Sequence, residues 1–273
     1  MTDATPTDAA HRPTARRAVV TGASSGIGEA TARKLRALGW DVVAVARRAE
    51  RLAALENEIG AVAFAADLTA AADVEALAEW LAETGPVDAL VNVAGGARGT
   101  DRVEDGDPDD WQWMFEVNVL ATQRLTAALL PLLRRAAADR AAHADVVFVT
   151  STAAQIAYAG GAGYNAAKAG QSMIAHALRL EVNGEPLRVI EIAPGMVQTE
   201  EFTLNRLGGD RAAADRVYED VQAPLTADDV ADVIGYALSA PGHVNLDLVT
   251  MRPVAQSAQH LLARGPLHVR TAG

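Results

Sequence analysis

The chain contains no cysteine, so disulfides, thiolate nucleophiles and cysteine-ligated metals are excluded. Its six histidines are scattered, with no pair at a metal-ligand spacing, and we expect no metal site. No apolar run approaches the length of about 18 residues that predicts a membrane-spanning helix. The formal net charge of −11 argues against nucleic acid or an anionic membrane as a partner, because both require a basic face.

Lysine is also scarce: the chain has only Lys34 and Lys168, and every other cationic side chain is an arginine, apart from the histidines. Lys168 stands four residues after Tyr164, a spacing that places the phenol and the ammonium on one face of a helix. A lysine is a compact charge suited to lowering the pKa of a neighbour. The pair therefore indicates a reactive tyrosine, although an ordinary surface pair has the same spacing.

The composition predicts one folded domain with a tail at each end. Apolar residues make up 50% of the chain, enough for a full core. Residues 1–15 are polar and lack an apolar signal segment, so we expect a disordered tail and a cytoplasmic protein. The domain is expected at 16–253, with a lid at 196–224. A second tail is expected at 254–273, beyond the last expected strand, and is a candidate for a segment that crosses to a neighbouring subunit.

Strand and helix signals alternate along this domain. Short apolar runs predict strands at 18–21, 41–46, 61–65, 89–93, 146–150, 187–192 and 246–251. Helices are predicted at about 27–38, 72–83, 108–135 and 228–238, through Leu52 to Gly60, and through Tyr164 to Val182. Residues 196–224 are expected to be irregular or weakly helical. The alternation predicts the α/β class, a single-domain, Rossmann-type, doubly wound parallel sheet that binds ligands at its C-terminal strand ends.

A glycine-rich turn joins the first strand to the first helix. Glycines allow a tight turn, and the free N–H groups of the helix start can bind a pyrophosphate. An ordinary glycine-rich loop is the alternative, but the position between strand and helix favours a dinucleotide site. The residues expected to bind a coenzyme here are Gly22, Ser24, Ser25, Gly26, Ile27 and Gly28.

The coenzyme preference is indicated at the end of the second strand. A site for NAD usually carries an acid there, about 20 residues after the turn, which binds the ribose 2′-hydroxyl. This sequence has Arg47 and Arg48 instead, and two guanidiniums suit a 2′-phosphate. We therefore expect NADP(H). The alternative is that both arginines merely cap a solvated helix start.

These features resemble those of the short-chain dehydrogenase/reductase family, over nearly all of the chain from residue 16 onward. The family's glycine turn matches Gly22, Gly26 and Gly28, and its adenine-contacting acid matches Asp67, with Leu68 after it. Its Asn-Asn-Ala-Gly segment matches Asn92, Ala94 and Gly95. Its nicotinamide loop matches Pro194, Gly195, Val197 and Thr199. Val93 replaces the second Asn of the segment, which removes one polar contact behind the adenine ribose. The family's catalytic tetrad matches Asn118, Ser151, Tyr164 and Lys168.

The resemblance implies that residues 16–253 form a dinucleotide-binding catalytic domain, and it gives each tetrad residue a role. Tyr164 transfers a proton, and Lys168 with the nicotinamide charge lowers the pKa of this phenol, which is otherwise too high. Lys168 also binds the nicotinamide ribose, together with Tyr164. Ser151 donates a hydrogen bond to the substrate oxygen. Asn118 positions a water that feeds protons through Lys168.

Two stretches, 158–161 and 242–254, resemble a narrower group, the NADP-dependent 3-hydroxy acid dehydrogenases that act on serine-like acids and malonic semialdehyde. Ala162 departs from that group, which has Asn there. The resemblance implies a small hydroxyl or carbonyl substrate and a homotetramer. An acidic substrate needs a cation near Tyr164. The candidates are Arg98, Arg206, Arg211 and Arg216. The alternative for each of them is a solvated arginine on the surface. Trp111 and Trp113 are expected to pack between helices.

Three functions remain open from the sequence. The first is an NADP(H)-dependent oxidoreductase that interconverts a small alcohol, such as a 3-hydroxy acid, and its carbonyl. The second is an aldehyde or ketone reductase of secondary metabolism. The third is a regulator that binds NADP(H) without catalysis. Such regulators typically lack the Tyr or the Lys, so the complete tetrad favours an enzyme.

Overall fold

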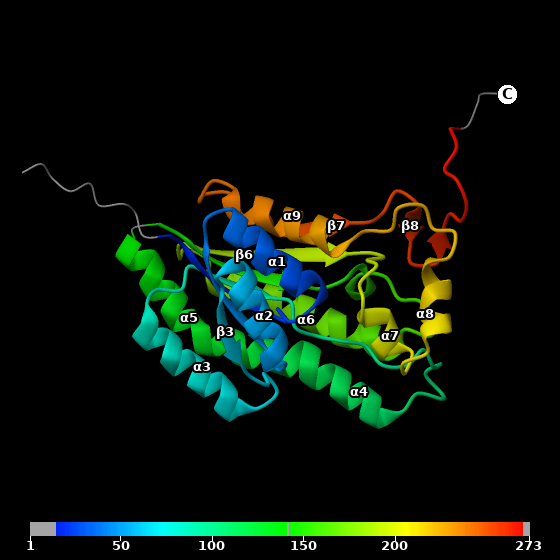
Figure 1. Cartoon of the computed structure of the whole chain (residues 1–273), viewed down its shortest axis with the longest axis horizontal. Coiled ribbons are helices and arrows are strands. Elements are labelled where there is room, and N and C mark those ends of the chain that lie inside the picture. Colours follow the sequence, from blue (N-terminus) through cyan, green and yellow to red (C-terminus); the bar gives the residue numbers. More distant parts are fainter. Residues whose placement is uncertain (1–14, 141, 270–273) are drawn as a thin grey trace, which may run out of the picture.

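Seven parallel strands form the central sheet in the computed structural model, which describes residues 15–140 and 142–269 (Figure 1). The strand order is β3-β2-β1-β4-β5-β6-β7. The first strand therefore lies inside the sheet, and successive strands are added on one side of β1 up to β3 and on its other side from β4 onward. Sheets of this kind bind ligands at the switch point, between β1 and β4. The strands are β1 (Arg17–Thr21), β2 (Asp41–Ala46), β3 (Val62–Ala65), β4 (Ala89–Asn92), β5 (Ala144–Val149), β6 (Leu187–Pro194) and β7 (Leu248–Met251).

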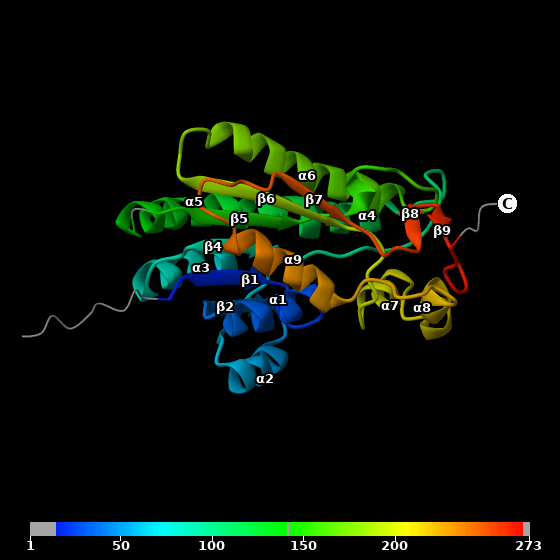
Figure 2. The same cartoon turned by 90° about the horizontal axis from the view of Figure 1, so that it is seen from above.

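Helices cover both faces of the sheet (Figure 2). One face carries α1 (Gly26–Ala37), α2 (Ala49–Ile59) and α9 (Ala227–Ser239). The other face carries α3 (Ala71–Thr84), α5 (Ala121–Arg140) and α6 (Ala162–Glu181). Both faces of the inner strands are therefore buried, and this explains why those strands are continuous apolar runs in the sequence.

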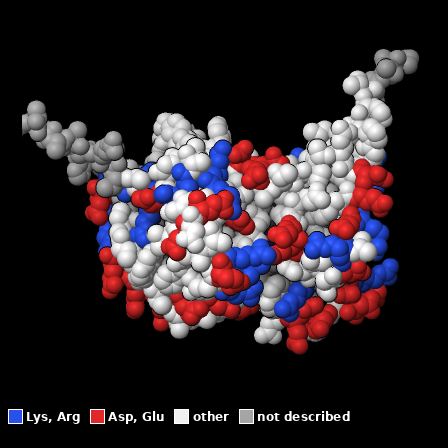
Figure 3. Space-filling model, in the orientation of Figure 1, with Lys and Arg blue, Asp and Glu red and all other residues white. Residues whose placement is uncertain are grey.

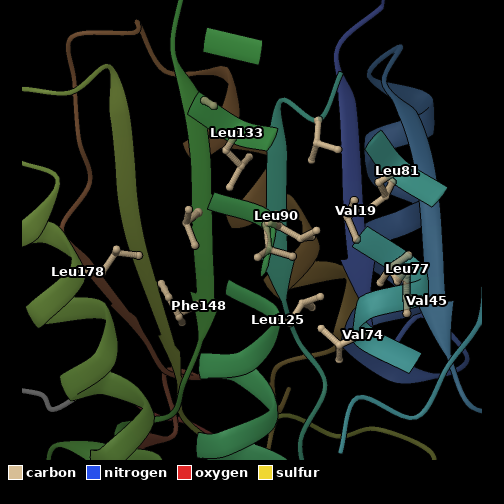
Figure 4. Close-up of a cluster of buried hydrophobic side chains, with 14 of the residues drawn as sticks. Val19, Val45, Val74, Leu77, Leu81, Leu90, Leu125, Leu133, Phe148 and Leu178 are labelled. Atoms are coloured by element: carbon tan, nitrogen blue, oxygen red, sulfur yellow. The ribbon is translucent and has the colours of Figure 1, made fainter. Parts of the chain in front are cut away.

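The core beneath α3, α5 and α6 is built from strand and helix side chains that are fully buried. Val19 of β1, Leu90 of β4 and Phe148 of β5 pack there against helix residues such as Leu77 and Leu125 (Figure 4). A second core lies on the opposite face of the sheet. The predicted single-domain, doubly wound α/β fold is confirmed.

One predicted helix is wrong in part. The stretch predicted as a single helix over 108–135 consists of α4 (Pro108–Phe115), a π-helix η1 (Glu116–Leu120) and α5. The wider turn lies around Asn118, whose Nδ2 donates to the Met114 carbonyl at 2.8 Å and to the Gly96 carbonyl at 2.9 Å. Single-turn π-helices of this kind are frequent at functional sites.

The segment expected as a lid contains two short helices, α7 (Phe202–Arg206) and α8 (Arg211–Tyr218). The chain beyond β7 forms an antiparallel pair, β8 (Gln256–Ala258) and β9 (Leu261–Leu262). This pair and α8 lie at the same end of the molecule (Figures 1 and 2). Gly265 N donates to the Asp220 carbonyl at 2.7 Å, so the described part of the C-terminal tail packs on the lid of its own chain.

The expected N-terminal tail, 1–15, lies outside the described residues except for residue 15. The domain boundaries drawn from the sequence stay predictions. Among the helices of the described ranges, none is long and apolar enough to cross a membrane.

Truncation of a core side chain tests this packing. Val19→Ala removes two methyl groups from a side chain that is 0% exposed, and we expect the free energy of unfolding to fall by about 2 kcal/mol. Val103→Ala is the matched control, because Val103 is 74% exposed, and its effect is expected within about 0.5 kcal/mol. Chemical denaturation of both variants at one protein concentration measures the difference. Equal effects would contradict the assigned core.

Candidate active site

A cavity of about 980 Å³ opens at the carboxyl ends of the strands. Its wall runs from the glycine turn after β1, past the ends of β2, β4 and β5, to the lid and the tail. This is where a doubly wound sheet binds a nucleotide.

The glycine turn has the geometry of a phosphate site. Gly22 and Gly26 have positive φ angles of 66° and 54°, which favour glycine. A Cβ on Gly28 would collide with the carbonyl oxygen of Gly22. Ser25 is the N-cap of α1 and makes no side-chain cap bond, so the first N–H groups of the helix remain available to an anion.

The ends of β1 and β4 are tied together by one hydroxyl. Thr21 Oγ1 accepts from the N–H groups of Val93 and Ala94, each at 2.9 Å, and donates to the Val91 carbonyl at 3.3 Å. Ala94 and Gly95 thereby line the cavity. Asn92, in contrast, is buried behind the wall, where its Nδ2 donates to Thr126 Oγ1 at 3.3 Å.

Arg48 is not a solvated helix cap, although it occupies the N-cap position of α2. Its guanidinium donates to the hydroxyl oxygens of Ser24 and Ser25, each at 2.9 Å. It also pairs with Glu201 of the lid at 2.7 Å. Arg47, next to it, lines the cavity and is exposed. Arg48 thus stands beside the phosphate turn, and Arg47 lines the same cavity. Their binding of a 2′-phosphate stays a prediction.

A buried hydroxyl close to Gly26 of the glycine turn also suits a bound coenzyme. Thr199 lines the cavity, and its Oγ1 is buried without a hydrogen-bond partner in the described part of the chain. Buried polar atoms are rarely left in this way, so a ligand in the cavity is the natural partner. Together with the glycine turn, Thr199 shows that the residues present fit a dinucleotide. The remaining predicted coenzyme residues that line the cavity are Ile27, Asp67, Leu68, Pro194, Gly195 and Val197.

Tyr164 and Lys168 come from the same face of α6, as their spacing predicts. Lys168 Nζ lies 6.0 Å from the centroid of the Tyr164 ring. Tyr164 lines the cavity together with Ser151, the N-cap of the short helix η2 (Thr152–Ala154) that follows β5. The structure therefore brings the phenol and the serine hydroxyl to one part of the wall.

Lys168 and Asn118 lie one layer behind the cavity wall. The ammonium of Lys168 donates to the Val149 carbonyl at 3.2 Å and to Gln171 Oε1 at 2.7 Å. A Cβ on Gly95 would stand 2.5 Å from Asn118 Oδ1 and 3.5 Å from Lys168 Nζ. Gly95 is thus the point of the wall at which both side chains arrive, and only a glycine fits there.

Burial dominates the electrostatics of the two groups. Burial raises the pKa of Tyr164, and the Tyr158 hydroxyl adds to this, while Ser151 and Arg206 act in the opposite direction. The sequence predicts that Lys168 and the nicotinamide charge lower the pKa of Tyr164. The polypeptide alone has the opposite effect on this pKa, because burial desolvates the phenolate. Burial lowers the pKa of Lys168 to about 7, against the attraction of the Glu191 carboxylate.

Arg206 is the candidate arginine nearest to the phenol. Its guanidinium carbon lies 5.5 Å from the centroid of the Tyr164 ring. Arg98 also lines the cavity, but it pairs with Asp110 at 3.2 Å and stacks on Trp113 at 4.1 Å. The other two candidates, Arg211 and Arg216 on α8, do not line the cavity.

Several wall residues were missed by the sequence analysis. Trp111 and Trp113, both on α4, pack against the small cluster that contains Tyr164 and Ala167 of α6. Trp113 also lines the cavity, so the expectation of packing alone is wrong for it. Gln256 and Gln259 of the tail also line the cavity. Gln256 Oε1 accepts from Met196 N, and Gln259 Oε1 accepts from the Thr152 hydroxyl, each at 2.8 Å. Isolated glutamines in an irregular segment carry no sequence signal for this role.

The geometry agrees with comparisons to known proteins. A family model described as short chain dehydrogenase matches residues 16–206. An uncharacterized oxidoreductase of Mycobacterium tuberculosis is 52% identical over 252 residues, 92% of this chain and 96% of that protein. Serine 3-dehydrogenase of Agrobacterium fabrum is 40% identical over 242 residues, 88% of this chain and 94% of that protein.

Among solved structures, the closed form of serine dehydrogenase complexed with NADP+ is similar to this one with a TM-score of 0.82 and 33% identity. The similarity covers 94% of this chain and 100% of that one. This share of the chain is larger than the part that the family model matches. The chain belongs to the short-chain dehydrogenase family.

Proposed function

We propose that this protein is an NADP(H)-dependent oxidoreductase that interconverts a small alcohol carrying an acid group, such as a 3-hydroxy acid, and its carbonyl compound. The observation that carries the proposal is the meeting of Tyr164, Ser151 and Arg206 at one part of the cavity. The two hydroxyls suit a reacting oxygen, and the guanidinium suits an acid group. The relatives named serine dehydrogenase support it, because serine is itself a 3-hydroxy acid.

NADP(H) is the proposed coenzyme. Arg47 and Arg48 line the cavity beyond β2, where a 2′-phosphate needs positive charge. The similar serine dehydrogenase structure contains NADP+, which supports the choice. When bound, NADP(H) gives or takes the hydride. The residues of this chain then have to hold it, orient the substrate and move one proton.

The proton is assigned to Tyr164. Negative charge builds on the substrate oxygen during reduction, and a hydrogen-bond donor there lowers the barrier. Ser151 donates to that oxygen, and Tyr164 supplies the proton. With its pKa at about 7, Lys168 can release and regain a proton near neutral pH, so it is suited to resupply the phenol. Asn118 holds the Gly96 backbone through both amide atoms and positions this wall.

The substrate class follows from the free donors of Arg206. Of its five N–H groups, three donate to the Gly99 carbonyl, the Tyr158 hydroxyl and the Gly160 carbonyl. Within the described part of the chain, Nη1 and Nη2 each retain one N–H without an acceptor. The two together suit the paired oxygens of a carboxylate or a sulfonate. On the face shown in Figure 3, basic and acidic side chains are intermixed without a continuous basic surface, so recognition of an anion depends on a local arginine.

Assembly as a homotetramer and location in the cytoplasm stay predictions. Exposed apolar side chains support self-association: Phe115, Leu120 and Met173 come from α4, η1 and α6, which pack against one another. Exposed apolar groups on adjoining elements are typical of protein interfaces.

Replacement of the phenol tests the proton assignment. We expect Tyr164→Phe to lower kcat by about two to four orders of magnitude, the usual contribution of general acid–base catalysis, because it removes only the hydroxyl. Binding of NADPH should stay within about threefold of the wild type. Steady-state kinetics and coenzyme fluorescence measure both quantities. Near-normal turnover would show that another group transfers the proton.

The pH dependence of folding tests the buried ammonium. The pKa of Lys168 is about 7 in the folded protein and 10.5 in its ordinary state, so the unfolded chain binds more protons between these values. The free energy of unfolding must then rise with pH across this window, by up to about 1.4 kcal/mol per pH unit from this group. We expect Lys168→Met to lose this rise between pH 7 and 9.5 in chemical denaturation. Parallel curves for the two proteins would contradict the lowered pKa.

Replacement of the guanidinium tests the substrate class. We expect Arg206→Met to reduce kcat/KM for 3-hydroxy acids or their carbonyl forms by about 10- to 100-fold, because a charged hydrogen bond is lost. The loss for neutral aldehydes should be much smaller. Arg98→Met is the control, and it should not alter the ratio between acidic and neutral substrates. An equal loss for both kinds would instead favour the reductase of bulkier, neutral carbonyls.

A further inference from the structure

Glu201 of the lid reaches the part of the cavity where β2 ends. Its carboxylate pairs with Arg48 at 2.7 Å and with Arg51 at 3.1 Å, and its side chain is only 22% exposed. The Ser25 hydroxyl, in the phosphate turn, also interacts with it. The hydrogen bond from Arg48 keeps the pKa of Glu201 below its ordinary value, so the carboxylate is charged at neutral pH.

Two partners of Glu201, Arg48 and Ser25, lie where the adenosine ribose of a coenzyme would bind. Arg48 also binds Ser24 and Ser25, and all four of these residues line the cavity. Nucleotide sites that accept NAD carry an acid for the ribose 2′-hydroxyl near the end of the second strand. In this chain the second strand is followed by two arginines, and the acid at that place comes from the lid.

We propose that Glu201 determines the discrimination between the two coenzymes: its carboxylate accepts a hydrogen bond from the 2′-hydroxyl of NAD(H) and competes with the 2′-phosphate of NADP(H) for Arg48. The inference rests on the proposed function, since it requires a pyridine nucleotide in the cavity. Both effects have the same sign, because each lowers the affinity for NADP(H) relative to NAD(H).

The neighbouring arginine explains why a 2′-phosphate is still accommodated. Arg47 lines the cavity and forms no ion pair within 4 Å in the described part of the chain, although its charge helps to lower the pKa of Asp67. Its guanidinium is therefore available to a phosphate. A phosphate that also reaches Arg48 meets a carboxylate that already uses this guanidinium. Two anions that share one guanidinium repel each other, and this repulsion weakens the binding of NADP(H) without abolishing it.

Glu201 also fastens the lid to the first turn of α2, through Arg48 and Arg51. Loss of that fastening alone would weaken both coenzymes by the same factor, because NADPH and NADH differ only at the 2′ position. The ratio of the two dissociation constants is therefore the informative quantity. It reports the 2′ position alone and cancels any change in the lid.

Binding titrations of the full-length protein test the inference. The dissociation constants of NADPH and NADH are measured by coenzyme fluorescence for the wild type, Glu201→Gln and Glu201→Ala. We expect both variants to shift the ratio of affinities toward NADPH by about tenfold, the value of one charged hydrogen bond. The matched control is Glu200→Gln, because the Glu200 side chain is 68% exposed and its ion pair with Arg51 is longer, at 3.7 Å. It should leave the ratio within about twofold.

The outcomes separate the inference from the proposed function. A ratio that stays within twofold of the wild type in both Glu201 variants, or weakening of both coenzymes by one factor, overturns the role in discrimination. A shift toward NADH also overturns it. If the wild type binds neither coenzyme, the proposed function itself fails. Thermal melts of the wild type and of each variant distinguish a loss of binding from a loss of the fold.

Discussion

A lysine ammonium buried beneath the carboxyl edge of the sheet is the constraint on which the arrangement of the site depends. A buried charge is tolerated only when hydrogen bonds replace its water. For Lys168 these come from the Val149 carbonyl, at the end of β5, and from Gln171 on the same helix. Because one acceptor belongs to the sheet and the other to α6, the ammonium is satisfied only when α6 docks on β5 in one register.

That register has consequences for every other member of the tetrad. It places Tyr164, one turn before Lys168, beside Ser151 at the exit of β5. It also brings the ammonium up to Gly95, where no side chain fits beside Asn118. Asn118 holds this backbone from the π-helix, whose wider turn carries it to the wall. The positions of these residues are thus set by packing requirements, and the proposed reaction would use the arrangement that results.

The sequence predicted the parts of the molecule that depend on local rules. Strands buried on both faces are continuous apolar runs, so β1, β2, β4 and β5 were identifiable, and the glycine turn follows from the φ angles it needs. The π-helix at Asn118 was not, because it depends on a contact with Gly96, more than 20 residues away. Gln256 and Glu201 were missed for the same reason: their roles arise only from how the tail and the lid fold back.

The lid is where such long-range contacts are concentrated, and Arg206 shows what this means for function. Its guanidinium binds the loops at Gly99 and Gly160 and the hydroxyl of Tyr158, so it joins the lid to two other segments of the wall. In the proposed function, an acid group of the substrate would bind the two remaining N–H groups of this guanidinium and add its binding energy to these contacts. A neutral substrate would lack that contribution, so the same side chain that joins these segments would also select the substrate.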